Sequence, residues 1–279
     1  MIDELEIRTA AGTFDVLAAG APGGREVLLL HGFPEGAREW EFQLGALGGG
    51  GCHAVAPDQR GYSPGVRPER AAEYRLEELV GDVVAIADAL GWERFDLIGH
   101  DCGAQVGWAT AAELPERVRT FSAVSHPHPA ALQQAIAEDE DQAQRSHHLT
   151  TLRQPRTAER GLLADDGAAL RRIFEWKIPE ERVEEYVRRL TLPGALTAAL
   201  NWYRAMPLAG SIGPACVPTL YVWGTEDAVF GSTAALATGK YVSGPYRFEM
   251  LEDVSHWVPE EASEALTRLL MQHLLAHRD

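Results

Sequence analysis

An aspartate occupies the centre of a short glycine-flanked motif, GHDCG, at residues 99–103. An apolar run ends at Ile98 and a helix-like run begins at Ala104, so the motif indicates a turn from a strand into a helix. Enzymes often place a nucleophile at such a turn, and the usual nucleophile there is serine. Asp101 therefore leaves two interpretations: an enzyme that has lost its serine, or one whose chemistry requires a carboxylate.

Two further residues complete a possible catalytic set. Asp227 follows an apolar run that ends at Trp223, and His256 follows the last such run of the chain. Nucleophile, acid and histidine occur in this chain order in α/β-hydrolase triads, each just past the end of a strand. A cap on the following segment is the alternative role for Asp227.

A carboxylate at this turn suits attack on a saturated carbon. With an ordinary pKa of about 3.9 it is ionised at neutral pH and needs no base for its own attack. The product is an alkyl ester, which His256, oriented by Asp227, hydrolyses by activating water. The backbone N–H groups of Phe33 and Cys102 are expected to form the oxyanion hole for that second step. A thiol nucleophile at Cys102 is the rival interpretation, although its side chain enters the helix.

The elements that position these residues alternate between apolar and amphipathic runs. We expect strands at 4–9, 13–18, 27–30, 52–56, 94–98, 118–124, 219–223 and 247–251, and helices at 76–90, 101–114 and 260–275. This pattern predicts an α/β-hydrolase fold, a mostly parallel twisted sheet with helices on both faces. No strand is expected between 127 and 210, so we divide the chain into a core, 1–126 and 211–279, and a helical cap, 127–210.

Composition limits the partners. The 279 residues carry a formal net charge of −16, which argues against nucleic acid or an anionic membrane as a partner. Three cysteines at unrelated spacings indicate no disulfide framework, and the first twenty residues lack the blocks of a signal peptide, so we expect a cytoplasmic protein. A monomer or a homodimer is expected.

The chain resembles the epoxide hydrolase and haloalkane dehalogenase branch of the α/β hydrolases over most of its length, and is most like a soluble epoxide hydrolase. The resemblance rests on HGFP at 31–34, DQRGYS at 58–63, GHDCG at 99–103, WGTED at 223–227 and SH at 255–256. It implies that Asp101 forms an alkyl ester, that 127–210 closes over the site, and that the substrate is a small, largely apolar epoxide. No cofactor and no metal are expected.

The leaving group separates members of this branch. Epoxide hydrolases protonate an alkoxide with cap tyrosines, and NWYR at 201–204 resembles their motif, which implies that Tyr203 is one such acid. The second tyrosine is missing, and aligning Pro155 with the family's proline places His148 at or near its position. An ordinary helix tyrosine and a solvated histidine are the alternatives.

The dehalogenase signatures are absent. Haloalkane dehalogenases carry tryptophan after the nucleophile and often asparagine in the early loop, where this chain has Cys102 and Phe33. Fluoroacetate dehalogenases carry two arginines, where this chain has Cys102 and Gln105.

The sequence therefore predicts an epoxide hydrolase that converts an oxirane to a vicinal diol. A haloalkane or haloacid dehalogenase with an atypical halide site is one alternative, and a non-catalytic binding protein with this fold is a less favoured one. Glu35 is expected either to orient the hydrolytic water or His256, or to be a surface charge. The Phe33–Pro34 bond is expected to be cis.

Overall fold

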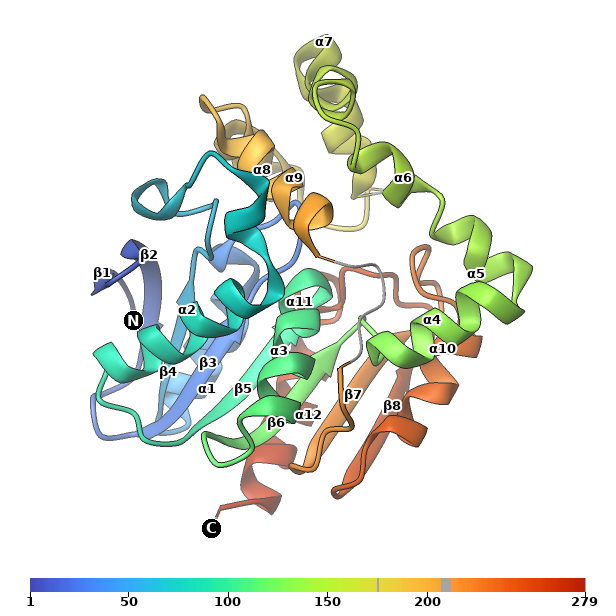
Figure 1. Cartoon of the computed structure of the whole chain (residues 1–279). Coiled ribbons are helices and arrows are strands. Elements are labelled where there is room, and N and C mark those ends of the chain that lie inside the picture. The colour runs from blue at the N-terminus through green and yellow to red at the C-terminus, as the bar shows by residue number, and fades with distance from the viewer. Residues whose placement is uncertain (175, 207–211, 279) are drawn as a thin grey trace.

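The computed structural model describes residues 1–174, 176–206 and 212–278, and its centre is an eight-stranded sheet (Figure 1). The strand order is β1-β2-β4-β3-β5-β6-β7-β8. Pairing is antiparallel from β1 to β2 and from β2 to β4, and parallel across the rest of the sheet. The strands are β1 Ile2–Thr9, β2 Gly12–Ala19, β3 Arg25–Leu30, β4 Cys52–Pro57, β5 Phe95–His100, β6 Val118–Val124, β7 Thr219–Gly224 and β8 Tyr246–Leu251.

Helices cover both faces of this sheet. Side chains alternate across a strand, so Leu28 and Leu30 of β3 join one apolar core while Val27 and Leu29 join another. The first core is closed by α2 (Leu76–Ala89) and α3 (Asp101–Glu113), and the second by α1 (Glu41–Gly49) and α12 (Ser263–Ala276). The predicted fold class is confirmed.

The predicted elements of the core are present with small differences in their ends. The helix expected at 260–275 is two helices, α11 (Val258–Glu261) and α12, which meet at Ala262. Helix α1 was not expected, because its segment EFQLGALGG contains three glycines and has little amphipathic character. The remaining elements of the core are α10 Ser232–Ala237 and the 3₁₀ helices η1 Ala37–Trp40, η2 Pro64–Val66, η3 Ala71–Tyr74 and η4 Thr238–Tyr241.

The segment between β6 and β7 forms helices and, within its described residues, no strand. These helices are α4 Pro129–Glu138, α5 Glu140–Arg145, α6 His148–Leu152, α7 Thr157–Ile173, α8 Glu180–Leu190 and α9 Ala195–Ala205. Helices α6 to α9 lie beyond one end of the sheet (Figure 1). The predicted boundary at 210 lies outside the described residues.

A hydrogen bond and an ion pair connect this helical insert to the segment that follows β4. The Trp202 indole N–H donates to the Arg60 carbonyl oxygen at 2.8 Å, and Arg189 of α8 forms an ion pair with Asp58 after β4. Across the described residues, no helix has both the length and the apolar character to cross a bilayer.

Candidate active site

Asp101 sits on a sharp turn between β5 and α3. Its φ is 45°, a left-handed conformation that non-glycine residues rarely adopt. A β-carbon on Gly99 would lie 2.6 Å from the Gly103 carbonyl oxygen, and one on Gly103 would lie 2.3 Å from that of Leu30. Both glycines are therefore required by close backbone packing, which holds Asp101 at the end of the sheet.

The surroundings of the Asp101 carboxylate favour its charged form. The Phe33 backbone N–H donates to Asp101 Oδ2 at 3.1 Å, and the predicted cis bond follows at Phe33–Pro34. Burial acts to raise the pKa of Asp101, but the imidazoles of His256 and His100 and the Phe33 hydrogen bond lower it below its ordinary value. Cys102 lies in the first turn of α3, where backbone N–H groups have no partner within the helix.

The structure brings Asp101, Asp227 and His256 together. His256 Nδ1 lies 2.9 Å from Asp227 Oδ2, and His256 Nε2 lies 3.7 Å from Asp101 Oδ1. Burial acts to lower the pKa of His256, whereas the carboxylates of Asp227 and Asp101 raise it, and the net shift is upward. The imidazole thus connects the acid to the carboxylate at the turn.

Asp227 fills both roles that the sequence left open. Its Oδ2 faces His256, and its Oδ1 accepts the backbone N–H groups of Val229 at 2.7 Å and Phe230 at 2.9 Å. These bonds cap the turn and hold the carboxylate in position. The insert reaches the same loop, since Arg145 Nη1 donates to the Asp227 carbonyl oxygen at 2.6 Å.

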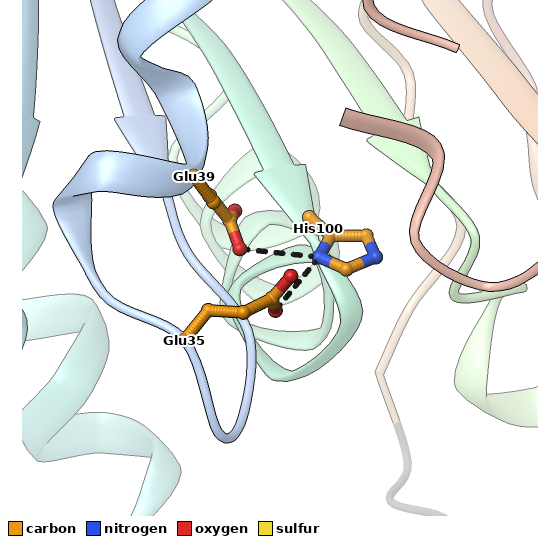
Figure 2. A group of neighbouring side chains, drawn as sticks. All are labelled: Glu35, Glu39 and His100. Atoms are coloured by element: carbon orange, nitrogen blue, oxygen red, sulfur yellow. Dashed lines mark hydrogen bonds and ion pairs between the residues drawn. The ribbon is translucent and has the colours of Figure 1, made fainter. Parts of the chain in front are cut away.

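Glu35 is buried, so the interpretation as a surface charge is wrong. Figure 2 shows Glu35 and Glu39 directed at His100, whose Nδ1 lies 3.3 Å from an oxygen of each. His100 Nε2 donates to the His256 carbonyl oxygen at 3.0 Å. Glu35 is therefore linked through His100 to the loop that carries His256.

These three side chains are also the group best placed to hold a cation. Their ligand atoms lie within 4.8 Å of one another. Protons can neutralise the group instead: burial lowers the pKa of His100, but the two carboxylates raise it further, well above its usual range. Burial and the Glu35 carboxylate also raise the pKa of Glu39 well above its usual range. That the reaction needs no metal stays a prediction.

A small cavity of about 50 Å³ connects Asp101 with the helical insert. Tyr203 of α9 lines it, with its ring edge-on to Phe33 and its hydroxyl oxygen accepting from Cys102 Sγ at 3.6 Å. Burial and the neighbouring Cys102 and Asp101 raise the pKa of Tyr203 well above its usual range, which keeps the phenol protonated.

His148 also lines this cavity, at its exposed end. Its Nδ1 lies 2.7 Å from the Arg145 carbonyl oxygen, and burial lowers its pKa, so the neutral ring donates from Nδ1. His148 therefore lies on the cavity wall, and it is also exposed to solvent, as the alternative interpretation expected.

A family model described as the alpha/beta hydrolase fold matches residues 26–263. The chain belongs to the α/β-hydrolase family. It is 32% identical to Epoxide hydrolase A of Mycobacterium tuberculosis (strain ATCC 25618 / H37Rv), over 93% of each chain. It is 30% identical to the AB hydrolase superfamily protein YfhM of Bacillus subtilis (strain 168), over 96% of each chain. The crystal structure of Epoxide Hydrolase A from Mycobacterium thermoresistibile superimposes with a TM-score of 0.87, at 26% identity over 98% of each chain.

The cavity of this α/β hydrolase contains residues that the sequence analysis did not place there. Arg153, Leu149 and Met206 line it from the insert, and Phe230 lines it from the loop after β7. Met206 lies three residues after Tyr203, a helical spacing that could have indicated it. Spacing from Tyr203 gives no such signal for Leu149, Arg153 or Phe230, which lie in other elements.

Cys102 of this α/β hydrolase is a poor nucleophile. Its side chain is buried, and burial, together with the Asp101 charge, raises the pKa of its thiol well above the usual range. The neutral thiol faces Tyr203, so the rival role for Cys102 has no support in this geometry.

Proposed function

We propose that this α/β hydrolase is an epoxide hydrolase that converts an oxirane to a vicinal diol. Relatives and structures that carry the name epoxide hydrolase align over nearly the whole chain, which supports this activity. The site argues for the same chemistry, because an ionised Asp101 faces a cavity with a protonated phenol on its wall.

The reaction proceeds in two steps on this chain's own residues. Asp101 Oδ1, the oxygen not bound to Phe33, attacks a ring carbon of the epoxide and forms an alkyl ester. Tyr203 donates its proton to the leaving oxygen as the C–O bond breaks. His148 becomes a second donor when its ring is protonated, because the single N–H of the neutral ring bonds the Arg145 carbonyl oxygen.

Water completes the reaction by attacking the carbonyl carbon of Asp101. His256, oriented by Asp227, takes the proton from this water. The backbone N–H groups of Phe33 and Cys102 stabilise the oxyanion on the Asp101 carboxyl group. Glu35 acts on this step through His100, which supports the His256 carbonyl oxygen. As the ester C–O bond breaks, His256 returns its proton to the leaving diol oxygen. The second proton of the water, which remains on the Asp101 carboxyl group, returns to Tyr203, so release of the diol restores the carboxylate and the phenol.

Tyr203 is the residue that favours an epoxide over an alkyl halide as the substrate. A departing halide takes no proton and is stabilised by N–H donors, whereas an alkoxide requires an acid. The Tyr203 hydroxyl contacts Cys102 on the cavity wall. Cys102 occupies the position at which a haloalkane dehalogenase carries a tryptophan. A dehalogenase with an atypical halide site is the second candidate, and the contact of Tyr203 with Cys102 disfavours it.

We expect Tyr203→Phe to slow opening of the epoxide by roughly 10²–10⁴-fold, the usual contribution of a positioned proton donor. Single-turnover alkylation measures this step on generic epoxides, with haloalkanes of similar size assayed in parallel. Tyr241→Phe removes a phenol that bonds Gln134, outside the described cavity wall, and should leave the rate unchanged. Turnover of haloalkanes alone, or an unaltered alkylation rate in Tyr203→Phe, would contradict the proposal.

Ester hydrolysis should slow as pH falls through the pKa of His256, because only the neutral imidazole accepts a proton from water. The Asp227 carboxylate raises this pKa, so Asp227→Asn should move the acid limb to lower pH and reduce the plateau rate. The measurement is the decay of alkylated enzyme against pH after a single turnover. Asp253→Asn, an exposed change, serves as control. A limb that stays in place in Asp227→Asn would show that another group sets it.

Three broader features belong to the same proposal. The insert at 127–210 acts as a cap, since its helices supply Tyr203 and His148 to the cavity wall. The protein is cytoplasmic, acts on small molecules, and works as a monomer or a homodimer.

A further inference from the structure

Arg153 occupies an unusual position on the cavity wall. It follows α6 directly and is half-buried, and its Nη2 donates to the Met206 carbonyl oxygen at 2.8 Å. Its Nε is buried and has no hydrogen-bond partner among the residues that the structure describes. A buried guanidinium N–H without an acceptor is costly, so the position favours a ligand that supplies one.

No described carboxylate lies close enough to Arg153 to affect its charge. Within the described part of the chain, burial is the influence on its pKa, which it lowers. The other half-buried arginines of the insert differ: Arg204 forms an ion pair with Glu159 at 2.9 Å, and Arg145 forms one with Asp141 at 2.6 Å. The same holds for Arg171, Arg182 and Arg189. Among the described residues of the insert, the arginines without an acidic partner are exposed, whereas Arg153 is half-buried.

Of the titratable side chains on the described cavity wall, Arg153 is the one that carries a positive charge at neutral pH. Burial lowers the pKa of His126 and of His148, so both imidazoles are neutral at neutral pH. Cys102 and Tyr203 keep their protons, and Asp101 carries the one negative charge. An anionic group entering the cavity is therefore attracted to Arg153 and repelled from Asp101.

We propose that Arg153 binds a carboxylate of the substrate, so that the preferred epoxides are epoxy acids in which the oxirane reaches Asp101 while the carboxylate pairs with the guanidinium. This inference rests on the proposed function and revises the expectation of a largely apolar substrate. A guanidinium matches a carboxylate through two parallel N–H donors, and Nε with one Nη provides such a pair here. In the reverse orientation the substrate carboxylate would face the Asp101 carboxylate, which would repel it. Pairing with Arg153 therefore also orients the oxirane toward Asp101.

Matched substrates separate charge from shape. We would compare 4-(oxiran-2-yl)benzoate with 4-(oxiran-2-yl)benzamide, and a shorter pair, 3-phenyloxirane-2-carboxylate with its carboxamide. For at least one pair, the wild-type kcat/KM should be at least about tenfold higher for the acid, as expected for a charge-assisted hydrogen bond. Arg153→Gln should lower kcat/KM for that acid by about 10–100-fold and change that for the amide by less than about threefold. Arg153→Lys should keep part of the preference.

Arg160→Gln is the matched control, because it removes an exposed arginine of the same insert that does not line the cavity. Its acid-to-amide ratio should equal that of the wild type. If Arg153→Gln lowers kcat/KM equally for both members of each pair, Arg153 only ties α6 to Met206 and the inference is wrong. Equal wild-type rates for acid and amide in both pairs would also overturn it.

A binding measurement separates this inference from the proposed function. The Kd of 4-(1,2-dihydroxyethyl)benzoate and of its benzamide, measured by calorimetry, requires no turnover. Tighter binding of the acid, lost in Arg153→Gln, supports the anion site even if no epoxide is hydrolysed, in which case the proposed function alone fails. Hydrolysis of neutral epoxides with no preference for the acid in rate or in Kd contradicts the Arg153 site alone.

Discussion

Asp101→Asn and Asp101→Ala are expected to reduce epoxide turnover by roughly 10⁴–10⁶-fold, the loss seen when a catalytic nucleophile is removed. An amide or a methyl group cannot form the alkyl ester, and no second nucleophile replaces it, because the neighbouring Cys102 thiol is held neutral. Steady-state rates and intact-protein mass after exposure to epoxide measure both effects. Asp88→Asn, an exposed change, should retain full activity.

Heavy-oxygen water identifies the atom that water attacks. In one turnover of the wild-type enzyme, label should enter the Asp101 carboxylate, and the first diol should remain unlabelled. Water reaches only the carbonyl carbon of the ester, and the oxygen first given to the diol comes from Asp101. Label in the first diol would show direct attack of water on the epoxide and would reduce Asp101 to a general base.

His256→Gln is expected to slow turnover by about 10⁴-fold while leaving the first step largely intact. Asp101 is ionised without help from a base, whereas the water of the second step requires one. The variant should therefore accumulate a covalent adduct, with the mass of the intact epoxide, on the peptide that contains Asp101.

The location of that adduct tests the whole assignment. The double variant Asp101→Asn/His256→Gln should form no adduct, and His53→Gln, remote from the cavity wall, should turn over normally. An adduct on Cys102 would instead support the thiol, and the absence of any adduct in His256→Gln would mean that the histidine also acts in the first step.

Much of the fold was predictable because its signals are local. The run of Val27 to Leu30 is apolar throughout, as a strand buried on both faces requires, and both adjacent strands are present. The turn at 99–103 was predictable because glycines are required where backbones approach closely. Helix α1 was missed because its own sequence is a weak helix former and its stability comes from packing against α12.

The local sequence could not determine whether His147 or His148 is the second donor to the leaving group. His147 and His148 are equivalent by type and adjacent in the chain, so a one-residue change of register exchanges them. The fold places His148 on the cavity wall and leaves His147 outside that wall. Glu35 and Glu39 present a similar case, because burial against His100 is what distinguishes them from the neighbouring, half-buried Glu41.

The sequence by itself determined the fold class, the carboxylate at the turn, and the chain order of Asp101, Asp227 and His256, because each depends on residue types at short spacing beside a strand. Only the tertiary structure decided which side chains of the helical insert reach Asp101. Arg145, Arg153, Arg156 and Arg160 look alike in sequence. Arg153 alone among them lines the cavity with Asp101, and its buried Nε has no partner among the described residues. Its position depends on contacts with residues distant along the chain, such as its hydrogen bond to the Met206 carbonyl oxygen, and the local sequence does not reveal these.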